Sequence, residues 1–293
     1  MSHKAGFVNI IGYPNVGKST LMNALVGEKL SIITSKAQTT RHRILGIVNG
    51  DDFQIVYSDT PGIVRDPAYK MHEKMNNYIE TALIDADVIL LLTEPGLRFS
   101  DEKILQGVIS STVPVLVLIN KIDLSSQEIV EEQIQYWREK IPKSEVMPVS
   151  ALQHFNIEKV FDSILERLPE SPAYYPKDEL TDRSERFFVS EMIREKIFQN
   201  YKKEVPYSVE VAVELFQETE KLIKIFAIIF VERESQKAIV LGHNGSAIKK
   251  TGTMAREAIE EFFGKKVYLQ LTVKVNKDWR NNDKTLERFG YDH

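Results

Sequence analysis

The chain contains no cysteine and no long hydrophobic run. Without cysteine it can form no disulfide, no thiolate metal site and no thiol nucleophile, which suits a reducing compartment. Its longest apolar run, residues 223–231, is interrupted by Lys224 and falls well short of the ~20 residues of a membrane-spanning helix. The N-terminal residues lead directly into a predicted strand, so no signal peptide is expected. These absences predict a cytoplasmic protein.

The net charge is negative except near the C-terminus. The net charge is −4, but residues 235–293 contain eleven Lys and Arg against seven Asp and Glu, so this end is positive by four and the remainder negative by eight. Such a distribution places any contact with nucleic acid at the C-terminal end. With 293 residues, 43% of them hydrophobic and 27% charged, the chain has the length and composition of a globular protein with two domains.

Short apolar strands alternate with helices over residues 1–170. Strands are expected at 7–11, 44–48, 53–57, 88–92, 113–119 and 146–149, and helices at 20–25, 69–83, 101–110, 127–140 and 157–168. The helix at 127–140 has apolar residues at Ile129, Val130, Ile134 and Trp137. Residues 28–43 show no period and are expected to form a loop. This alternation predicts an α/β domain with a mostly parallel six-stranded sheet and helices on both faces.

The pattern changes after residue 170. Pro169, Pro172 and Pro176 indicate an extended linker over residues 171–182. Beyond it we expect, in order, a helix at 183–203, strands at 208–217 and 222–232, an apolar strand at 238–241, a helix at 246–263, a strand at 266–275 and a closing helix at 279–289. Residues 183–293 are therefore predicted to form a smaller α+β domain.

The segment Gly12-Tyr-Pro-Asn-Val-Gly-Lys-Ser19 follows a strand and precedes a helix, as a phosphate-binding loop does. Its glycines let several N–H groups point at one anion, and the start of the helix adds partial positive charge. Lys18 should reach the β- and γ-phosphates, and Ser19 should bind Mg²⁺. The alternative is a glycine-rich turn before a core helix. The residues predicted around the phosphates are Gly12, Asn15, Val16, Gly17, Lys18, Ser19, Thr20 and Gly62.

Asp59-Thr-Pro-Gly62 matches the pattern D-x-x-G and follows a predicted strand. Asp59 at the strand end can hold Mg²⁺ through water, and the Gly62 N–H can contact the γ-phosphate. The alternative is a type II turn. The nucleotide role is favoured because the motif lies ~40 residues after the phosphate loop.

Of these motifs, Asn120-Lys-Ile-Asp123 discriminates best between guanine and adenine nucleotides. The Asp123 carboxylate only accepts hydrogen bonds, and guanine presents two adjacent donors where adenine presents an acceptor. A buried mismatch of this kind can cost on the order of 10⁴-fold. Asn120 should join loops and reach the purine, and the stem of Lys121 should cover the base. Ser150 and Ala151 complete the predicted pocket, and the Ala151 N–H should donate to the guanine carbonyl. The alternative for the motif at 120–123 is a capped loop before a helix.

The second predicted domain contains Gly242-His-Asn-Gly245 before a helix, the G-x-x-G pattern of KH domains. Two glycines let this loop approach a sugar–phosphate backbone, and the helix start favours phosphate. Apolar residues should form a groove floor against bases, and two lysines should add charge. The alternative is a simple turn into a helix. The predicted RNA-binding residues are Ile239, Leu241, Gly242, His243, Asn244, Gly245, Ile248, Lys249 and Lys250.

These motifs carry a resemblance that covers nearly the whole chain. The N-terminal half resembles Ras-like P-loop GTPases, and the entire chain resembles the Era family, bacterial GTPases with an appended type II KH domain. The resemblance rests on GYPNVGKS, KAQTTRHR, DTPG, NKID, SAL and VLGHNGSAIKKTG. It implies GTP hydrolysis that serves assembly of the small ribosomal subunit, and RNA binding near the 3′ end of small-subunit ribosomal RNA.

The resemblance also implies roles that spacing alone does not assign. Thr40, rather than Thr39, should give its hydroxyl to Mg²⁺. Ile63 stands where Ras-type enzymes place a water-orienting glutamine, which implies slow intrinsic turnover. Asn15 should help to bind K⁺ beside the phosphates in place of an arginine finger, although Arg41 and Arg43 are alternative fingers. The catalytic residues expected are Lys18, Asn15 and Thr40.

The sequence therefore predicts a GTP-dependent switch with GTP or GDP, Mg²⁺ and K⁺ as cofactors. Its partners should be small-subunit ribosomal RNA and the small ribosomal subunit. A monomer is expected, with a peripheral contact to the inner face of the cytoplasmic membrane. Three alternatives stay open: a P-loop kinase or ATPase, against which Asp123 argues; an RNA chaperone in which GTP is only a structural clamp; and a purely structural assembly factor.

Overall fold

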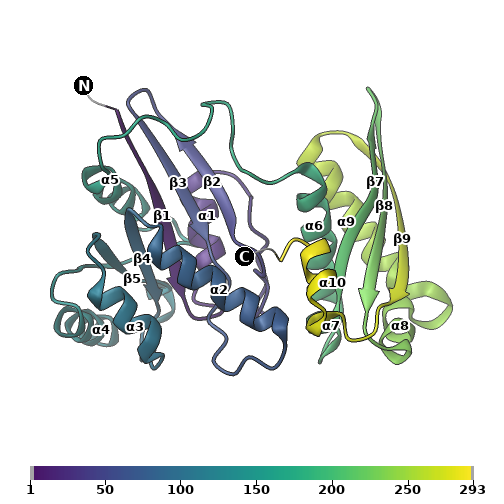
Figure 1. The fold of residues 1–293 in the computed structure, drawn as a ribbon, viewed down its shortest axis with the longest axis horizontal. Helices are drawn as coiled ribbons and strands as arrows, with labels where there is room; N and C mark the ends of the chain where they lie inside the picture. Colours follow the sequence, from purple (N-terminus) through teal and green to yellow (C-terminus); the bar gives the residue numbers. More distant parts are fainter. Residues whose placement is uncertain (1–2, 292–293) are drawn as a thin grey trace. The chain divides into compact units, whose positions relative to one another are not determined.

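A computed structural model describes residues 3–291 of the chain. Residues 1–2, on which the expectation of no signal peptide partly rests, and residues 292–293, which belong to the predicted second domain, lie outside the described residues. Residue contacts divide the described chain into two compact units (Figure 1). The first comprises residues up to 182 except 69–71, and the second comprises the residues from 183 onward together with 69–71.

The first unit is built on six strands: β1 (Lys4–Gly12), β2 (Ile44–Asn49), β3 (Phe53–Asp59), β4 (Val88–Thr93), β5 (Val115–Ile119) and β6 (Glu145–Pro148). They form one sheet in the order β2-β3-β1-β4-β5-β6. β2 runs antiparallel to β3, and every other neighbouring pair is parallel. β4 and β5 are buried along their whole length. Strands buried on both faces read as continuous apolar runs, as these two do in the sequence.

The helices of this unit are α1 (Lys18–Val26), α2 (Lys70–Ile84), α3 (Glu102–Ser110), α4 (Gln127–Lys140) and α5 (Ile157–Arg167), with the 3₁₀ turn η1 (Ile122–Leu124) before α4. α1 and α2 lie on opposite faces of the sheet (Figure 1). The predicted fold class is thus confirmed for this unit. The phosphate loop follows β1, the D-x-x-G segment follows β3, and the N-K-I-D and S-A segments follow β5 and β6. All four motifs therefore meet at one edge of the sheet.

The buried side of α4 includes a polar residue. Gln133 and Trp137 are buried, whereas Ile129 is 44% exposed. Gln133 tolerates burial because its side-chain amide donates to the carbonyl of Leu97 at 2.8 Å. A polar side chain that finds a buried partner can thus occupy a position that hydrophobicity alone would give to isoleucine.

The proline-containing segment 171–182 has neither helix nor strand, and it is bound to β2 and β3. Gln54 in β3 is fully buried. Its Oε1 accepts from the N–H groups of Tyr174 (2.7 Å) and Tyr175 (3.0 Å), and its Nε2 donates to the carbonyl of Tyr175 (2.8 Å). Ile47 of the edge strand β2 donates its N–H to the carbonyl of Leu180 at 2.8 Å. The segment is therefore an attached part of the first unit.

The second unit contains α6 (Glu185–Asn200), α7 (Val205–Ser208), β7 (Glu210–Glu218), β8 (Leu222–Val231), α8 (Glu234–Leu241), the 3₁₀ turn η2 (His243–Gly245), α9 (Ser246–Phe263), β9 (Lys266–Val275), η3 (Trp279–Asn281) and α10 (Asp283–Arg288). Its sheet has the order β7-β8-β9, with β7 and β8 antiparallel and β8 and β9 parallel. α6 packs against α9 and β7, and α9 also packs against β9. The predicted α+β class is confirmed.

The strand predicted at 238–241 is wrong, because these residues form the last turn of α8. The helix begins where the side-chain oxygen of Gln236 accepts the N–H groups of Glu232 (3.0 Å) and Arg233 (3.1 Å). An apolar run of four residues is too short to separate a strand from a helix by its period. The G-x-x-G segment consequently joins two helices, α8 and α9, rather than a strand and a helix.

The predicted helices at 183–203 and 279–289 are each interrupted in the structure. α6 ends at Asn200, and a separate short helix, α7, follows with Pro206 in its first turn. The C-terminal segment divides into η3 and α10, with Asn282 capping α10 through a 3.0 Å bond to the N–H of Thr285. Pro206 and Asn282 mark the starts of new helices, because proline is favoured in the first turn of a helix and asparagine at the residue that caps its N-terminus.

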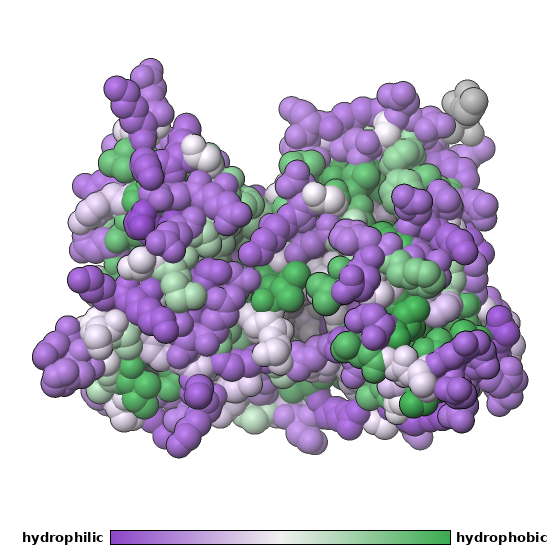
Figure 2. Space-filling model, turned by 180° about the vertical axis from the view of Figure 1, so that it is seen from behind, coloured by the Kyte–Doolittle hydropathy of each residue, from purple (hydrophilic) through white to green (hydrophobic). Residues whose placement is uncertain are grey.

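Within residues 3–291, no helix is both long and apolar enough to cross a membrane. Figure 2 shows one face of the molecule, on which apolar side chains gather in several patches that hydrophilic residues separate.

Replacing Gln54 with leucine should loosen segment 171–182. Three backbone groups of the segment would lose their partners, and a net value of ~1 kcal/mol for each bond predicts a loss of about 2–3 kcal/mol. Limited trypsin digestion of the full chain should then cut faster at Lys177, which lies in the segment. Gln106→Leu, at an exposed position of α3, serves as the matched control. Equal cutting rates in the two variants would contradict the role given to Gln54.

Candidate nucleotide-binding and RNA-binding sites

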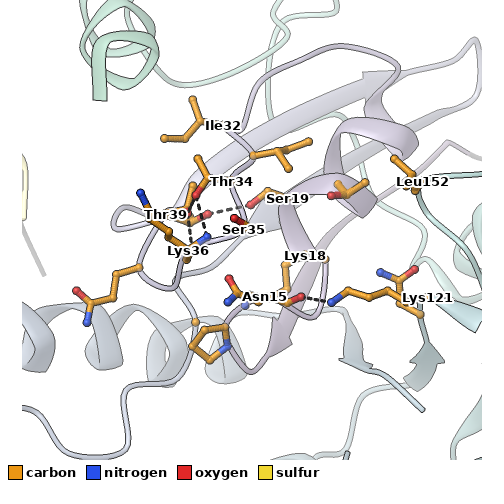
Figure 3. Close-up of a pocket in the computed structure, with 18 of the residues that line it drawn as sticks. Asn15, Lys18, Ser19, Ile32, Thr34, Ser35, Lys36, Thr39, Lys121 and Leu152 are labelled. Atoms are coloured by element: carbon orange, nitrogen blue, oxygen red, sulfur yellow. Dashed lines mark hydrogen bonds between the residues drawn. The ribbon is translucent and has the colours of Figure 1, made fainter. Parts of the chain in front are cut away.

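A cavity of about 420 Å³ opens where the motifs of the first unit meet. Figure 3 shows Asn15, Lys18 and Ser19 between the segment around Thr34 on one side and Lys121 on the other. Eleven residues predicted from the motifs line the cavity: Asn15, Gly17, Lys18, Ser19, Thr20, Thr40, Gly62, Asn120, Lys121, Asp123 and Ser150. Four predicted residues do not line the cavity but form hydrogen bonds with residues that do. They are Gly12, Val16, Asp59 and Ala151.

Part of the cavity lining lies outside the predicted residues. Leu124 and Leu152, which directly follow two of the motifs, stand at the cavity with exposed fractions of 79% and 71%. The other lining residues not predicted are Pro14, Ile32, Ile33, Thr34, Ser35, Lys36, Gln38 and Thr39. Most of them lie in the segment 28–43, whose lack of periodicity gives no signal of position. Adjacency to a motif could have identified the two leucines.

The loop of residues 12–19 turns tightly around the Lys18 side chain. Lys18 is buried, and its Nζ donates to the carbonyls of Gly12 (3.0 Å) and Tyr13 (2.9 Å). Burial lowers the pKa of Lys18 to about 8, and the nearby charge of Asp59 opposes this shift. A bound polyphosphate would favour the protonated form of this lysine.

Two glycines of the site permit close approaches between backbone segments. Gly17 has a φ of +98°, and a Cβ there would lie 2.3 Å from the side-chain nitrogen of Asn120. A Cβ on Gly62 would lie 2.7 to 2.8 Å from atoms of Pro14. Any larger residue would push the phosphate loop away from its neighbours, so these positions require glycine.

Ser19, Thr40 and Asp59 bring three oxygens together. The Ser19 hydroxyl lies 2.8 Å from the Thr40 hydroxyl and donates to Asp59 Oδ2 at 2.7 Å, and Thr40 Oγ1 donates to the same oxygen at 3.4 Å. Burial raises the pKa of Asp59, and Lys18 opposes this effect. Thr39 instead donates to the carbonyl of Lys36 at 2.7 Å. Thr40, and not Thr39, therefore belongs to this cluster of oxygens.

The cluster fits Mg²⁺. Adjacent oxygens of an octahedral Mg²⁺ site with ligands at 2.0–2.1 Å are about 2.9 Å apart, and hard oxygen donors are the ligands this ion prefers. The 2.8 Å between the hydroxyls of Ser19 and Thr40 matches that spacing. Within residues 3–291 there is no group of three or more His, Cys, Asp or Glu side chains suited to a metal. The cluster therefore suits an ion that takes its remaining ligands from phosphate and water.

Asn120 joins the loops on the base side of the cavity. Its Nδ2 donates to the carbonyl of Val16 at 2.8 Å, and its Oδ1 accepts from the N–H of Ala151 at 2.9 Å. The predicted bond from the Ala151 N–H to the guanine carbonyl stays a prediction. Asp123 accepts from the Ser150 hydroxyl at 2.6 Å through Oδ1, which orients the carboxylate.

The two arginines considered as fingers are held elsewhere. Arg43 donates to Asp85 at 2.5 Å and to Ser58 at 2.7 Å, and Arg41 is fully buried. Neither is among the residues that line the cavity. Ile63 is buried, with 3% of its surface exposed. Asn15, by contrast, lines the cavity, is exposed, and has a φ of +65°.

In the second unit, the G-x-x-G turn is formed by η2 between α8 and α9. Gly242 has a φ of +71°, and a Cβ there would lie 2.6 Å from the Cβ of Ala247. His243 and Asn244 are exposed at the tip of the turn, with Asn244 at a φ of +50°. Lys249 and Lys250 are exposed on the first turns of α9. The turn thus presents backbone and positive charge together, as binding of a phosphate chain requires.

The predicted groove residues are accessible to different extents. Ile239 on α8 is 49% exposed, and Leu241 and Ile248 are half-buried. Gly245 occupies the position that precedes α9. Although residues 238–241 are helical rather than extended, three apolar side chains remain near the turn.

Two family models match the chain. Residues 7–121 match the model of the 50S ribosome-binding GTPase, and residues 204–280 match the model of the KH domain. A relative named GTPase Era, from Clostridium kluyveri, is 43% identical over 98% of this chain and 99% of its own length.

Two solved structures resemble both units together. A crystal structure of Era in complex with MgGDPNP and nucleotides 1506–1542 of 16S ribosomal RNA matches with a TM-score of 0.94 and 38% identity, covering 99% of this chain and 100% of the other. A variant of Aquifex aeolicus Era bound to GDP·AlF4⁻ matches with the same TM-score, identity and coverage.

Lys18 should take up a proton when GDP binds above neutral pH. With its pKa near 8, Lys18 in the free protein lacks its proton in about a quarter of molecules at pH 7.5 and about three quarters at pH 8.5. The phosphate charge restores that proton, so affinity should fall as pH rises through 8. Calorimetric titration in buffers of different ionisation enthalpy measures the uptake. A value near zero throughout this range would contradict the shift.

Proposed function

Because this chain belongs to the Era family of GTPases, we propose that it is a GTP-hydrolysing switch that binds small-subunit ribosomal RNA near its 3′ end and assists assembly of the small ribosomal subunit. One observation carries this proposal: the chain combines a phosphate-loop cavity that contains Asp123 with the G-x-x-G turn of a KH domain. Its cofactors are GTP or GDP and Mg²⁺. Each part of the proposal rests on particular side chains.

For hydrolysis, we assign the phosphates to the Lys18 side chain and to backbone N–H groups of the predicted residues, which are Gly12, Asn15, Val16, Gly17, Lys18, Ser19, Thr20 and Gly62. Mg²⁺, when bound, supplies positive charge at the β- and γ-oxygens, and Ser19, Thr40 and Asp59 would hold it. The oxygen spacing of this cluster supports the assignment. These groups would stabilise the charge that develops as water attacks the γ-phosphate in line.

The attacking water needs a further group. Ile63 follows Gly62, and its apolar side chain can neither orient nor activate water. Slow intrinsic turnover is therefore expected. We propose that Asn15 binds K⁺ beside the β- and γ-phosphates; its place in the cavity lining and its exposure support this role.

For base selection, we propose that Asp123 accepts hydrogen bonds from guanine. The bond from Ser150 leaves the second carboxylate oxygen for the base. The stem of Lys121 would cover one face of the purine, and Asn120 holds the loops that carry these residues. An adenine nucleotide would place acceptor against acceptor, which disfavours a kinase or ATPase.

For RNA, we propose that the turn 242–245 contacts the sugar–phosphate backbone and that α8 and α9 provide the groove. Lys249 and Lys250 would add charge, and Ile239, Leu241 and Ile248 would contact bases. The exposure of the turn and of Ile239 supports this arrangement. We also propose residues 1–170 as the GTPase domain, 171–182 as the connection and 183–293 as the RNA-binding domain. The cytoplasmic location, the monomeric state and the peripheral membrane contact stay predictions.

A double variant, His243→Asp with Asn244→Asp, tests RNA binding. It puts two negative charges at the exposed tip of the turn, and aspartate tolerates the positive φ at position 244. Affinity for an oligonucleotide with the 3′-end sequence of small-subunit ribosomal RNA should fall about tenfold or more. Gln270→Glu with Thr272→Glu adds the same charge at exposed positions of β9 and should change affinity much less.

GTP turnover is measured on the same proteins with and without this RNA. Hydrolysis by the unaltered chain supports the proposed enzyme. If no hydrolysis occurs in either condition, a chaperone role with GTP as a structural clamp is favoured. If the unaltered chain binds no RNA, a purely structural assembly factor is favoured.

Asn15→Ala and Asn15→Gly test the K⁺ site. Alanine at a φ of +65° is strained, whereas glycine adopts this conformation freely, so the pair separates the loss of the amide from backbone strain. Both variants should hydrolyse GTP at equal rates in K⁺ and in Na⁺. If either variant keeps the K⁺ stimulation of the unaltered enzyme, the assignment of Asn15 is wrong.

A further inference from the structure

The ammonium group of Lys121 lies between two oxygens from other loops. It donates to the backbone carbonyl of Asn15 in the phosphate loop at 2.5 Å, a bond drawn in Figure 3. It also pairs with Glu94 Oε2 at 2.6 Å. Glu94 directly follows β4 and belongs to none of the nucleotide motifs. A chain of contacts thus runs from the end of β4 through the guanine-binding loop to the phosphate loop.

The bond from the Lys121 side chain joins Lys121 to Asn15, and both of these residues have unfavourable backbone conformations. Asn15 has a φ of +65° and Lys121 a φ of +62°. Residues other than glycine adopt this region only when surrounding contacts hold them there. The bond from the Lys121 side chain to the Asn15 carbonyl is one such contact. Its loss would let the phosphate loop relax at Asn15.

Lys121 differs from its neighbour Asn120 in how firmly it is held. Consecutive residues bind consecutive carbonyls, with Asn120 on Val16 and Lys121 on Asn15. Asn120 is buried, so its amide has no alternative partner in water. The side chain of Lys121 is 34% exposed, and its long stem has several conformations available. An exposed lysine needs a second contact to stay on one carbonyl.

Glu94 provides that second contact from a fixed position. It follows the fully buried β4, and its own carbonyl accepts the N–H of Leu97 at 3.1 Å, which closes a turn. With both side chains 34% exposed, the ion pair contributes little to folding stability. Its effect is to limit where the ammonium group can go.

We propose that Glu94 is a positioning residue of the nucleotide site, which keeps Lys121 on the Asn15 carbonyl and thereby slows the release of guanine nucleotides. The proposal rests on the proposed function, because it concerns the same cavity. It predicts a change in the rate of release without a change in the choice of base, since Asp123 and Ser150 make no contact with Glu94 among the described bonds.

Glu94→Gln in the full chain tests this role, because it removes the charge and keeps the shape. Release of a fluorescent GDP analogue, measured by stopped flow, should become about fivefold faster, as expected when a bond from a charged donor is weakened. The ratio of GDP to ADP affinity and the thermal unfolding midpoint should not change. Glu132→Gln, at an exposed position of α4, is the matched control and should release GDP at the unaltered rate.

A double-mutant cycle separates positioning from a general effect of charge. Lys121→Met should speed release by itself, and adding Glu94→Gln should then change nothing further, because Glu94 acts through Lys121. The proposal is overturned if Glu94→Gln releases GDP at the unaltered rate, if the two substitutions are additive, or if Glu132→Gln has an equal effect. Failure of the unaltered chain to bind GDP would instead refute the proposed function.

Discussion

The nucleotide site depends on one buried amide, that of Asn120 at the end of β5. Its Nδ2 donates to the carbonyl of Val16, its Oδ1 accepts from the N–H of Ala151, and its own N–H donates to the carbonyl of Thr93. The phosphate loop and the ends of three strands are therefore joined at one residue. Because a Cβ on Gly17 would collide with this amide, the position of Asn120 requires a glycine in the loop of residues 12–19. The two halves of the site cannot vary independently.

The two units share one backbone arrangement at the start of a helix. α1 and α9 are each preceded by a glycine in the left-handed conformation, Gly17 with a φ of +98° and Gly245 with a φ of +75°. Glycine has no side chain to cap the first N–H groups of a helix, so these donors stay available to an anion and add the positive end of the helix dipole. In the first unit Gly17 lines the cavity of about 420 Å³. In the second unit the arrangement stands at an exposed turn, where a long chain can pass.

Most of the site could be predicted because its residues directly follow buried strands. The positions of Lys18, Asp59 and Asp123 follow from motif spacing alone, since parallel strands place their carboxyl ends together. Hydrogen bonds between distant segments could not be predicted. Such bonds join Ala151 to Asn120 and attach Gln54 to segment 171–182. The cavity-lining residues of the loop 28–43 and the helical state of residues 238–241 were also not predicted, because the sequence has no usable period there.

The attachment of segment 171–182 also bears on aggregation. β2 is an edge strand, and unpaired N–H groups on such an edge are a template for pairing with other chains. The carbonyl of Leu180 occupies one of these groups, on Ile47, and the segment also satisfies the buried amide of Gln54. A fragment cut at residue 170 would keep every nucleotide motif but would expose this edge. The part of the chain that can fold without self-association is therefore longer than the part that binds the nucleotide.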